Sequence, residues 1–339
     1  MAYKLGGKRK NRILYREKII KGLLMNIDVN YFPGFTRKAI TFTMDDGNVR
    51  LDKKFIDIIK PYGFFGTFNL TSADKHGYTP EDYRRIYSGY EIANHCYNHP
   101  LALDDSIDYI FSDELFDADV AIEDGKTLYR DAEIDGIWWL KNSKNRWGKM
   151  RYAKCEDYIR FVKQAQENLE SVFGAGAVGA FVWPYSRQRK NAAVCEYIDN
   201  SAFYAVRANR NLADTTGFAM PTDRKDWGYN AGFTNLLEVA EKFDACPDDG
   251  ELKLFAFGIH SHDYENNNRW DDMRTFAKKY GNRPEDFWYA TNREIFEYED
   301  ALRSVITEDG KITNPTDKKL YIKVDGQRFI LEPKSSLEI

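Results

Sequence analysis

Three short segments of the chain contain residues that together could perform metal chemistry. Residues 43–47 read Thr-Met-Asp-Asp-Gly, residues 95–99 read His-Cys-Tyr-Asn-His, and residues 259–262 read Ile-His-Ser-His. They supply two adjacent carboxylates and two pairs of imidazoles, which are the groups needed to bind a divalent cation and to place an acid and a base beside it. The combination predicts a metal-dependent hydrolase.

Each segment also has a simpler interpretation. An Asp-Asp-Gly sequence after an apolar run is typical of a solvated turn, and an isolated His-x-x-x-His pair is more often a surface feature, although its spacing would place both rings on one face of a helix. The distribution of histidine favours the functional interpretation. Of the five histidines, His95, His99, His260 and His262 lie in the two clusters, and only His76 lies outside them.

Composition narrows the class of protein. The chain has 339 residues, and its 49 Lys and Arg against 53 Asp and Glu give a net charge of −4, so no general attraction to nucleic acid is expected. The many aromatic residues (22 Tyr, 22 Phe and 7 Trp) either pack in the core or line a cleft where sugar rings stack. The four cysteines form no C-x-x-C pair, so neither a disulfide framework nor a thiolate zinc site is expected.

Sequence features also bear on the cellular location. The first 21 residues are basic but have no uninterrupted apolar segment and no small-residue cleavage site. No run approaches the roughly 20 apolar residues of a membrane span. The chain as printed is therefore expected in the cytoplasm, whereas a chain already trimmed of a signal segment would look the same and would be extracytoplasmic.

Strand-like and helix-like segments alternate along the chain. The hydrophobic pattern predicts strands at residues 38–44, 63–70, 89–93, 179–183, 203–207 and 252–259, and helices at residues 51–59, 83–87, 155–173 and 269–280. This alternation predicts parallel strands joined by crossover helices, in a barrel or an open sheet. The residues of the three chemical segments follow strand ends, where barrels keep their active sites.

The order of the motifs resembles the polysaccharide deacetylase family, also called the NodB homology domain or carbohydrate esterase family 4. Four family motifs have counterparts: T-F-D-D-G at residues 43–47, H-[ST]-x-x-H at 95–99, R-x-P-Y at 182–185 and the late histidine motif at 254–260. This chain departs from the family pattern at three positions: Met44 replaces Phe, Cys96 replaces the hydroxyl residue and Val182 replaces Arg. The resemblance covers roughly residues 38–300.

The resemblance implies an α/β fold, a deformed (β/α) barrel of the NodB type. We expect an N-terminal extension at residues 1–37 and a catalytic domain at 38–305. Within that domain, residues of about 102–154 resemble an insertion, which either shapes the substrate cleft or is a packed surface excursion. Residues 312–339 are expected to form a small β-hairpin appendage, because Asp325-Gly326 between alternating strands is typical of a two-residue turn.

Metal ligands follow from the resemblance. It implies that Asp46, His95 and His99 hold one divalent ion, with positions left open for water and a substrate oxygen. Zinc is the first expectation, and cobalt or nickel would accept the same ligands.

The resemblance also assigns catalytic roles. Asp45 would be the general base that takes a proton from the attacking water, and the backbone N–H of Tyr185, together with the metal, would stabilise the oxyanion. His260 is the expected acid for the leaving amine, and His262 is the alternative. In the family, an arginine keeps the base ionised; since Val182 cannot do this, Arg207 at the end of the next strand is predicted to replace it.

The implied substrate is a glycan. Four residues are expected to contact it: Trp183, Pro184, Trp227 and His262. Asp223 and Asp226 would orient the acid or line the cleft. The predicted reaction removes acetyl groups from N-acetylated amino sugars; the alternatives are a carbohydrate O-acetyl esterase on the same fold and a non-catalytic carbohydrate-binding relative.

Overall fold

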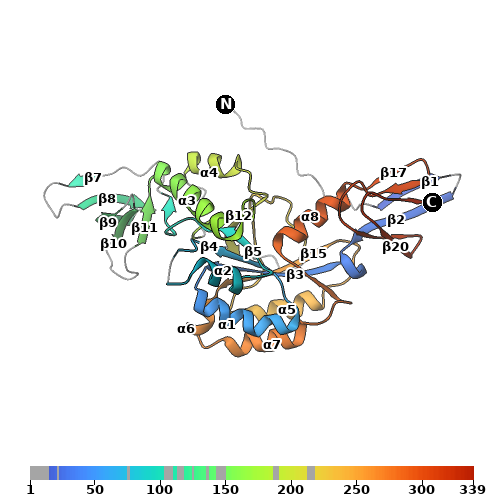
Figure 1. Cartoon of the computed structure of the whole chain (residues 1–339), viewed down its shortest axis with the longest axis horizontal. Coiled ribbons are helices and arrows are strands. Elements are labelled where there is room, and N and C mark those ends of the chain that lie inside the picture. Colours follow the sequence, from blue (N-terminus) through green and yellow to red (C-terminus); the bar gives the residue numbers. More distant parts are fainter. Residues whose placement is uncertain are drawn as a thin grey trace.

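A curled parallel sheet with helices around it forms the centre of the molecule, and smaller sheets extend from two sides (Figure 1). The computed structural model describes residues 15–20, 23–74, 77–102, 110–112, 118–123, 126–134, 137–142, 150–185, 191–211 and 218–339.

The central sheet has the strand order β14-β13-β12-β5-β4-β3-β15, with every neighbouring pair parallel. A further strand, β16, pairs with the first half of β3. The two ends of this order meet at a parallel bridge between Ala231, just after β14, and Phe257 in β15. The sheet therefore closes on itself as a deformed barrel, as predicted. The strand bounds are β3 Lys38–Asp46, β4 Thr67–Leu70, β5 Glu91–Asn94, β12 Val178–Val182, β13 Ala205–Asn211, β14 Trp227–Tyr229, β15 Lys253–His260 and β16 Phe287–Tyr289.

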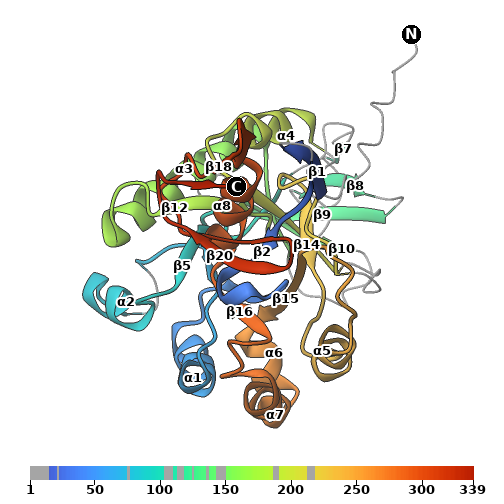
Figure 2. The same ribbon diagram turned by 90° about the vertical axis from the view of Figure 1, so that its right-hand side faces the viewer.

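Helices cover the outside of this barrel, and Figure 2 shows α2, α1, α7 and α5 following one another around it. The helix bounds are α1 Val49–Ile59, α2 Pro80–Ile86, α3 Cys155–Phe173, α4 Ala192–Asp199, α5 Leu236–Asp244, α6 Ser261–Asn266, α7 Trp270–Tyr280 and α8 Asn292–Arg303. Two short 3-10 helices span Pro33–Phe35 and Lys60–Tyr62. Each predicted strand and helix overlaps an observed element. Helix α3 has the predicted bounds, and the apolar stripe that supports this prediction is buried along one face of the helix.

The close approach of β3 and β15 depends on one glycine. Gly258 lies opposite Thr43 in the register of the two strands, and its φ is 152°. A Cβ atom there would lie 2.1 Å from the carbonyl oxygen of Thr43. Because only glycine fits, the strands stay in contact up to their last pair, Asp45 and His260.

Strands from the N-terminal and C-terminal regions of the chain share one sheet. Strands β1 (Tyr15–Ile20), β2 (Leu23–Tyr31), β19 (Leu320–Val324) and β20 (Gln327–Leu331) form an antiparallel sheet in the order β1-β2-β19-β20. The predicted hairpin joins β19 to β20, and both turn residues, Asp325 and Gly326, have positive φ (48° and 80°), as a type I′ turn requires. A separate three-stranded sheet is formed by strands that precede β19 and follow β20 in the sequence: β17 (Ile306–Glu308), β18 (Lys311–Thr313) and β21 (Ser336–Glu338).

The region predicted as an insertion contains its own sheet, with the order β6-β11-β10-β9-β8-β7. Its strands are β6 Leu101–Ala102, β7 Ile110–Ser112, β8 Ala118–Glu123, β9 Lys126–Ile134, β10 Ile137–Asn142 and β11 Met150–Ala153. In Figure 1 this sheet extends to the left of α3.

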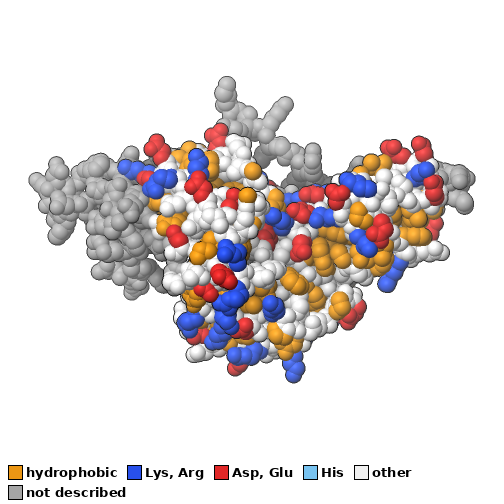
Figure 3. Space-filling model, viewed as in Figure 1, with side chains coloured by type: hydrophobic (Ala, Val, Ile, Leu, Met, Phe, Trp, Pro, Cys, Tyr) orange, Lys and Arg blue, Asp and Glu red, His pale blue; other side chains and the backbone are white. Residues whose placement is uncertain are grey.

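Figure 3 shows basic and acidic side chains interspersed on the face that it presents, with no large area of one sign. None of the described helices is both long enough and apolar enough to cross a bilayer.

Candidate active site

The chemical residues of the three segments meet at the carboxyl end of the barrel strands. Asp45 and Asp46 end β3, His95 follows β5, and His260 ends β15. Because these strands are parallel, their carboxyl ends lie at the same edge of the sheet. The sequence segments, up to 215 residues apart (from 45 to 260), therefore form one site.

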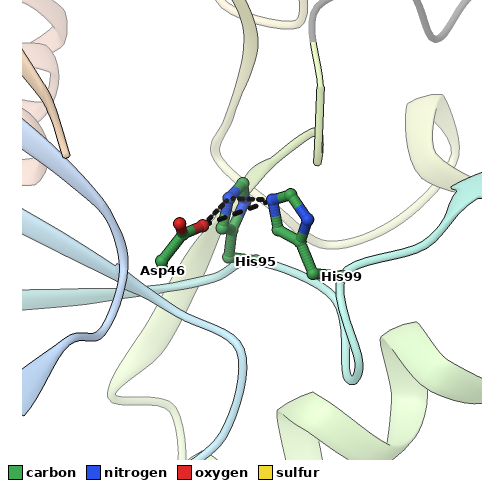
Figure 4. Close-up of side chains that lie close together, drawn as sticks. All are labelled: Asp46, His95 and His99. Atoms are coloured by element: carbon green, nitrogen blue, oxygen red, sulfur yellow. Dashed lines mark hydrogen bonds and ion pairs between the residues drawn. The ribbon is translucent and has the colours of Figure 1, made fainter. Parts of the chain in front are cut away.

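Three atoms form a compact triangle in this site (Figure 4). Nε2 of His95 lies 3.1 Å from Nε2 of His99, and Oδ1 of Asp46 lies 3.5 Å from the first nitrogen and 3.3 Å from the second. Ligands at about 2.0–2.1 Å from a tetrahedral zinc ion are about 3.3 Å apart. Oδ1 of Asp46 is buried and, among the described residues, has no hydrogen-bond partner. The three residues therefore fit a divalent cation.

The backbone fixes which nitrogen of His95 faces this triangle. Its Nδ1 lies 2.8 Å from the carbonyl oxygen of Val182. Since that oxygen can only accept, Nδ1 carries the proton and donates it, which leaves the lone pair of Nε2 directed at Asp46 and His99. This arrangement is the one that a metal-ligating histidine normally has.

The segment from His95 to His99 is not helical, so the helical spacing expected from the sequence is wrong. Cys96, Asn98 and His99 have positive φ values of 57°, 63° and 52°, which the α-helix does not allow. The segment is a turn after β5, and it still brings the two imidazoles within 4.7 Å of each other, centroid to centroid. Asp46 also has positive φ (76°), and such strain is concentrated at functional sites.

The two carboxylate oxygens of Asp45 differ in hydrogen bonding: among the described residues, Oδ1 has two donors and Oδ2 has none. Oδ1 accepts hydrogen bonds from Nη2 of Arg207 and, at 2.6 Å, from Nδ2 of Asn69. Oδ2 is buried, accepts no hydrogen bond from the described residues, and lies 3.9 Å from Nε2 of His95. Burial alone would raise the pKa of Asp45, but the positive charge of Arg207 is the main influence in the opposite direction, and the pKa is lowered.

Asn69 is a site residue that the sequence did not reveal. It lies on β4 directly opposite Asp45 in the register of β3 and β4, and its amide also donates to Oγ1 of Thr43. Nothing in its sequence context distinguishes it from other strand residues. Only the strand register identifies it.

His260 is oriented by an acidic residue one helical turn away. Its Nδ1 lies 2.9 Å from Oδ2 of Asp263, and its Nε2 lies 3.8 Å from Oδ2 of Asp46. Burial lowers the pKa of His260, but the hydrogen bond to Asp263 and the charges of Asp46 and Asp45 outweigh it and raise the pKa to about 9. The sequence predicts that Asp223 and Asp226 orient the acid or line the cleft, whereas in the structure the carboxylate at hydrogen-bonding distance from His260 is that of Asp263.

His262 lies beside His260, with stacked rings whose centroids are 4.6 Å apart. Its side chain is 36% exposed, and its Nδ1 lies 3.9 Å from Oδ2 of Asp46. His262 also lines a pocket of about 310 Å³ next to Asp46. The other lining residues are Asn48, Val49, Arg50 and Tyr78.

The tryptophans expected to contact a sugar are in the core instead. Trp183 is 3% exposed and packs against Phe181, with ring centroids 5.2 Å apart. Trp227 is 4% exposed and packs against Phe296 at 5.3 Å. Their rings have no free face for stacking, so the expectation is corrected for both. Pro184 is also buried.

Tyr185 lies at the edge of the cluster of Asp46, His95 and His99. Its ring centroid is 4.5 Å from that of His99, and its φ of 54° places it in the left-handed region. The chain therefore turns sharply shortly after β12, next to His99.

Comparison with known proteins identifies the family. A family profile described as polysaccharide deacetylase matches residues 33–203, about half of the chain. No curated protein matches. Among solved structures, the chain is similar to the Xyl-CE4 domain of a multidomain xylanase from the hindgut metagenome of Trinervitermes trinervoides, at 15% identity and a TM-score of 0.41 over 78% of this chain and 92% of that one.

Two further solved structures have similar scores. The peptidoglycan deacetylase PdaC from Bacillus subtilis is 14% identical, with a TM-score of 0.41 over 78% of this chain and 92% of that one. A family 4 acetyl xylan esterase from Clostridium thermocellum, in complex with a cobalt ion, is 13% identical, with a TM-score of 0.40 over 77% and 92% of the two chains. The profile match contains the segments of Asp45, Asp46, His95 and His99, and on that match the chain belongs to the polysaccharide deacetylase family.

Proposed function

We propose that this protein is a metal-dependent hydrolase that removes acetyl groups from N-acetylated amino sugars of a glycan. The observation that carries the proposal is the triangle of Asp46, His95 and His99, with Oδ2 of Asp45 3.9 Å from Nε2 of His95 and Nε2 of His260 3.8 Å from Oδ2 of Asp46. Membership of the family supplies the polysaccharide as the substrate class. The amide bond is our own choice, because an amine must be protonated to leave, and the imidazole of His260 near Asp46 supports such a step.

Asp46 Oδ1, His95 Nε2 and His99 Nε2 would hold the ion, with zinc as the first choice and cobalt or nickel as alternatives. When bound, the ion would supply Lewis acidity, which polarises the acetyl carbonyl and makes water a stronger acid. The protein prepares the ligands in advance, since the carbonyl of Val182 already fixes the tautomer of His95.

Two side chains, Asp45 and His260, transfer protons in the proposed reaction. Oδ2 of Asp45 takes a proton from the attacking water, while Arg207 and Asn69 hold Oδ1 and keep the carboxylate ionised. The backbone N–H of Tyr185 donates to the oxyanion that forms at the acetyl carbonyl. His260 then donates a proton to the leaving amine.

His260 is preferred over His262 as the acid because of what holds each ring. Nδ1 of His260 is fixed by Asp263 at 2.9 Å, which directs Nε2 toward the ligands. His262 is more exposed and makes no contact of comparable length with Asp263, whose Oδ1 lies 3.9 Å from its Nε2. We assign His262 to the substrate pocket that it lines.

Acetate release after reconstitution with zinc, cobalt or nickel tests the proposal. We expect release from N-acetylglucosamine oligomers, and loss of that release in Asp45→Asn. Release from acetylated xylan alone would identify an O-acetyl esterase instead. Glycan binding by the metal-loaded protein without release from a broad panel would identify a non-catalytic relative, and either result overturns the proposal.

A further inference from the structure

A buried carboxylate outside the proposed mechanism connects α1 to the segment that carries the acid. Asp52 lies on α1, six residues after Asp46, and is 0% exposed. Its Oδ1 accepts a hydrogen bond of 2.6 Å from Oγ of Ser261, and its Oδ2 accepts one of 2.8 Å from the hydroxyl of Tyr87. Ser261 is also 0% exposed and stands between His260 and His262.

This carboxylate is an unfavourable choice for stability alone. It interrupts the buried apolar face of α1 that includes Leu51, Phe55 and Ile56. None of the described lysines, arginines or histidines forms an ion pair with it, and its two side-chain hydrogen bonds come from neutral hydroxyl groups. A buried acidic residue that breaks the apolar pattern of its helix without a cationic partner is expected where function requires it.

The segment that Asp52 reaches has little support of its own. Helix α6 begins at Ser261 and has only six residues, too few for intrinsic stability. His260 is its N-cap residue and provides no side-chain capping bond. The orientation of this segment must therefore come from tertiary contacts, and the hydrogen bond from Ser261 to Asp52 anchors its first residue to α1.

We propose that Asp52 is a positioning residue which, through Ser261, holds the His260–His262 segment in place beside the metal ligands. This inference rests on the proposed function in taking His260 as the acid. It goes beyond that proposal by assigning a role to a pair of side chains, Asp52 and Ser261, that touch neither the substrate nor the ligands. The hydrogen-bond acceptor at position 52 is the required feature, and its charge is not.

Tyr87 provides a matched control for this inference. Its hydroxyl donates to the same carboxylate with nearly the same length, but it follows α2 and leads away from the site. If Asp52 serves only the core, then loss of either hydroxyl should have the same consequences. If Asp52 acts through Ser261, only loss of the serine hydroxyl should disturb His260.

The experiment compares Ser261→Ala, Tyr87→Phe, Asp52→Leu and Asp52→Asn in the full-length, zinc-loaded protein. We expect Ser261→Ala and Asp52→Leu each to lower kcat about tenfold to a hundredfold with little change in KM, as small misplacements of a catalytic group do. The double variant Ser261→Ala with Asp52→Leu should have a kcat no lower than that of either single variant, because both substitutions remove the same hydrogen bond. Tyr87→Phe should keep kcat, and Asp52→Asn should retain most of it, because its amide can bond both hydroxyls.

A second readout is independent of turnover. The imidazole NMR signals of His260, assigned with a His260→Gln variant, should shift or broaden in Ser261→Ala and stay unchanged in Tyr87→Phe. Unchanged signals and wild-type kcat in Ser261→Ala would overturn the inference, as would equal effects of Ser261→Ala and Tyr87→Phe. If the wild type releases no acetate, the proposed function fails, while the NMR comparison still tests the anchoring of His260.

Discussion

Arg207 donates a hydrogen bond from Nη2 to Oδ1 of Asp45, and both side chains are fully buried. In the register of β12 and β13, Arg207 stands directly opposite Val182. Position 182 is where the family motif R-x-P-Y has its arginine. Because side chains directly opposite each other on adjacent strands point to the same face of a sheet, an arginine at either position reaches the same space. In this chain, the cationic partner of Asp45 therefore lies on the neighbouring strand, β13.

Replacing Arg207 should therefore disable the base. In Arg207→Met, Asp45 keeps its buried charge without its cationic partner, which is expected to destabilise the fold by about 3–5 kcal/mol. We also expect kcat/KM to fall by at least about a hundredfold, because the base is no longer held and kept ionised. Urea unfolding and acetate release measure the two effects.

The double variant Val182→Arg with Arg207→Val is the control for this prediction. If the shared position of the guanidinium is what matters, the exchange should restore part of the activity that Arg207→Val alone has lost. Full activity in Arg207→Met would show that Asp45 needs no such partner.

Metal binding should depend on the three residues of the triangle. We expect Asp46→Asn, His95→Ala and His99→Ala to lose the visible absorption of the cobalt-loaded protein and the rise in Tm on adding zinc. At a zinc concentration 1,000 times the dissociation constant, that stabilisation is about 4 kcal/mol. His76→Ala is the matched control, since His76 lies outside both clusters in the sequence. Normal cobalt spectra in all three ligand variants would contradict the site.

The two late histidines should differ in which kinetic constant they affect. His260→Ala should lower kcat by about 10²–10⁴, the usual contribution of a general acid, whereas His262→Ala should mainly raise KM because His262 lines the pocket. The kcat of Asp263→Asn should lie between those of the wild type and His260→Ala, because the substitution weakens the hydrogen bond that orients His260. The opposite pattern would reassign the acid to His262.

The sequence was sufficient to place the main elements of the site. A parallel α/β sheet brings strand ends together whatever the details of packing, so residues that follow predicted strands, such as Asp46 and His95, could be expected to meet. The hairpin at Asp325 was predictable for a similar reason, since its turn chemistry is local.

What the sequence could not show depends on long-range geometry. Asn69 joins the site through strand register, and β2 pairs with β19 across almost the whole chain. Neither relationship has a local signal, because register and pairing are properties of two strands together. The burial of Trp183 and Trp227 depends in the same way on the packing around them, and local pattern cannot distinguish a core aromatic from one that lines a cleft.

The contact between β3 and β15 should be intolerant of any side chain at position 258. In Gly258→Ala, the new Cβ would lie 2.1 Å from the carbonyl oxygen of Thr43, so the strands must separate at the end that carries Asp45 and His260. We expect destabilisation of more than about 4 kcal/mol, together with loss of zinc binding.

Gly326→Ala is the control for that variant. Gly326 also has positive φ (80°), but a Cβ there meets nothing within 4 Å. The substitution Gly326→Ala should lower the free energy of unfolding only by roughly 1 kcal/mol, the penalty for a side chain in the left-handed backbone region. Equal destabilisation by the two substitutions, measured by urea unfolding, would show that the steric contact with Thr43 is not the cause.

The buried carboxylate of Asp52 should make stability depend on pH. Burial raises its pKa from the ordinary value of 3.8 to about 7, although the hydrogen bonds from Ser261 and Tyr87 act in the opposite direction. Ionisation is then harder in the folded state than in the unfolded one, so the free energy of unfolding should fall as the pH rises from about 4 to about 7. Below this range the carboxyl is neutral in both states and the penalty is absent.

Asp52→Asn should remove this dependence, because an amide does not ionise. Relative to the wild type, the variant should therefore gain stability steadily between pH 4 and pH 7 and then level off. A difference of about three pKa units sets the limit of that gain at about 4 kcal/mol. Urea unfolding of both proteins at a series of pH values, with a chelator present, measures it. Parallel pH profiles for the two proteins would contradict the prediction. In Ser261→Ala, which removes a donor to the ionised form, the pKa of Asp52 should rise further, so the decline should continue to a higher pH than in the wild type.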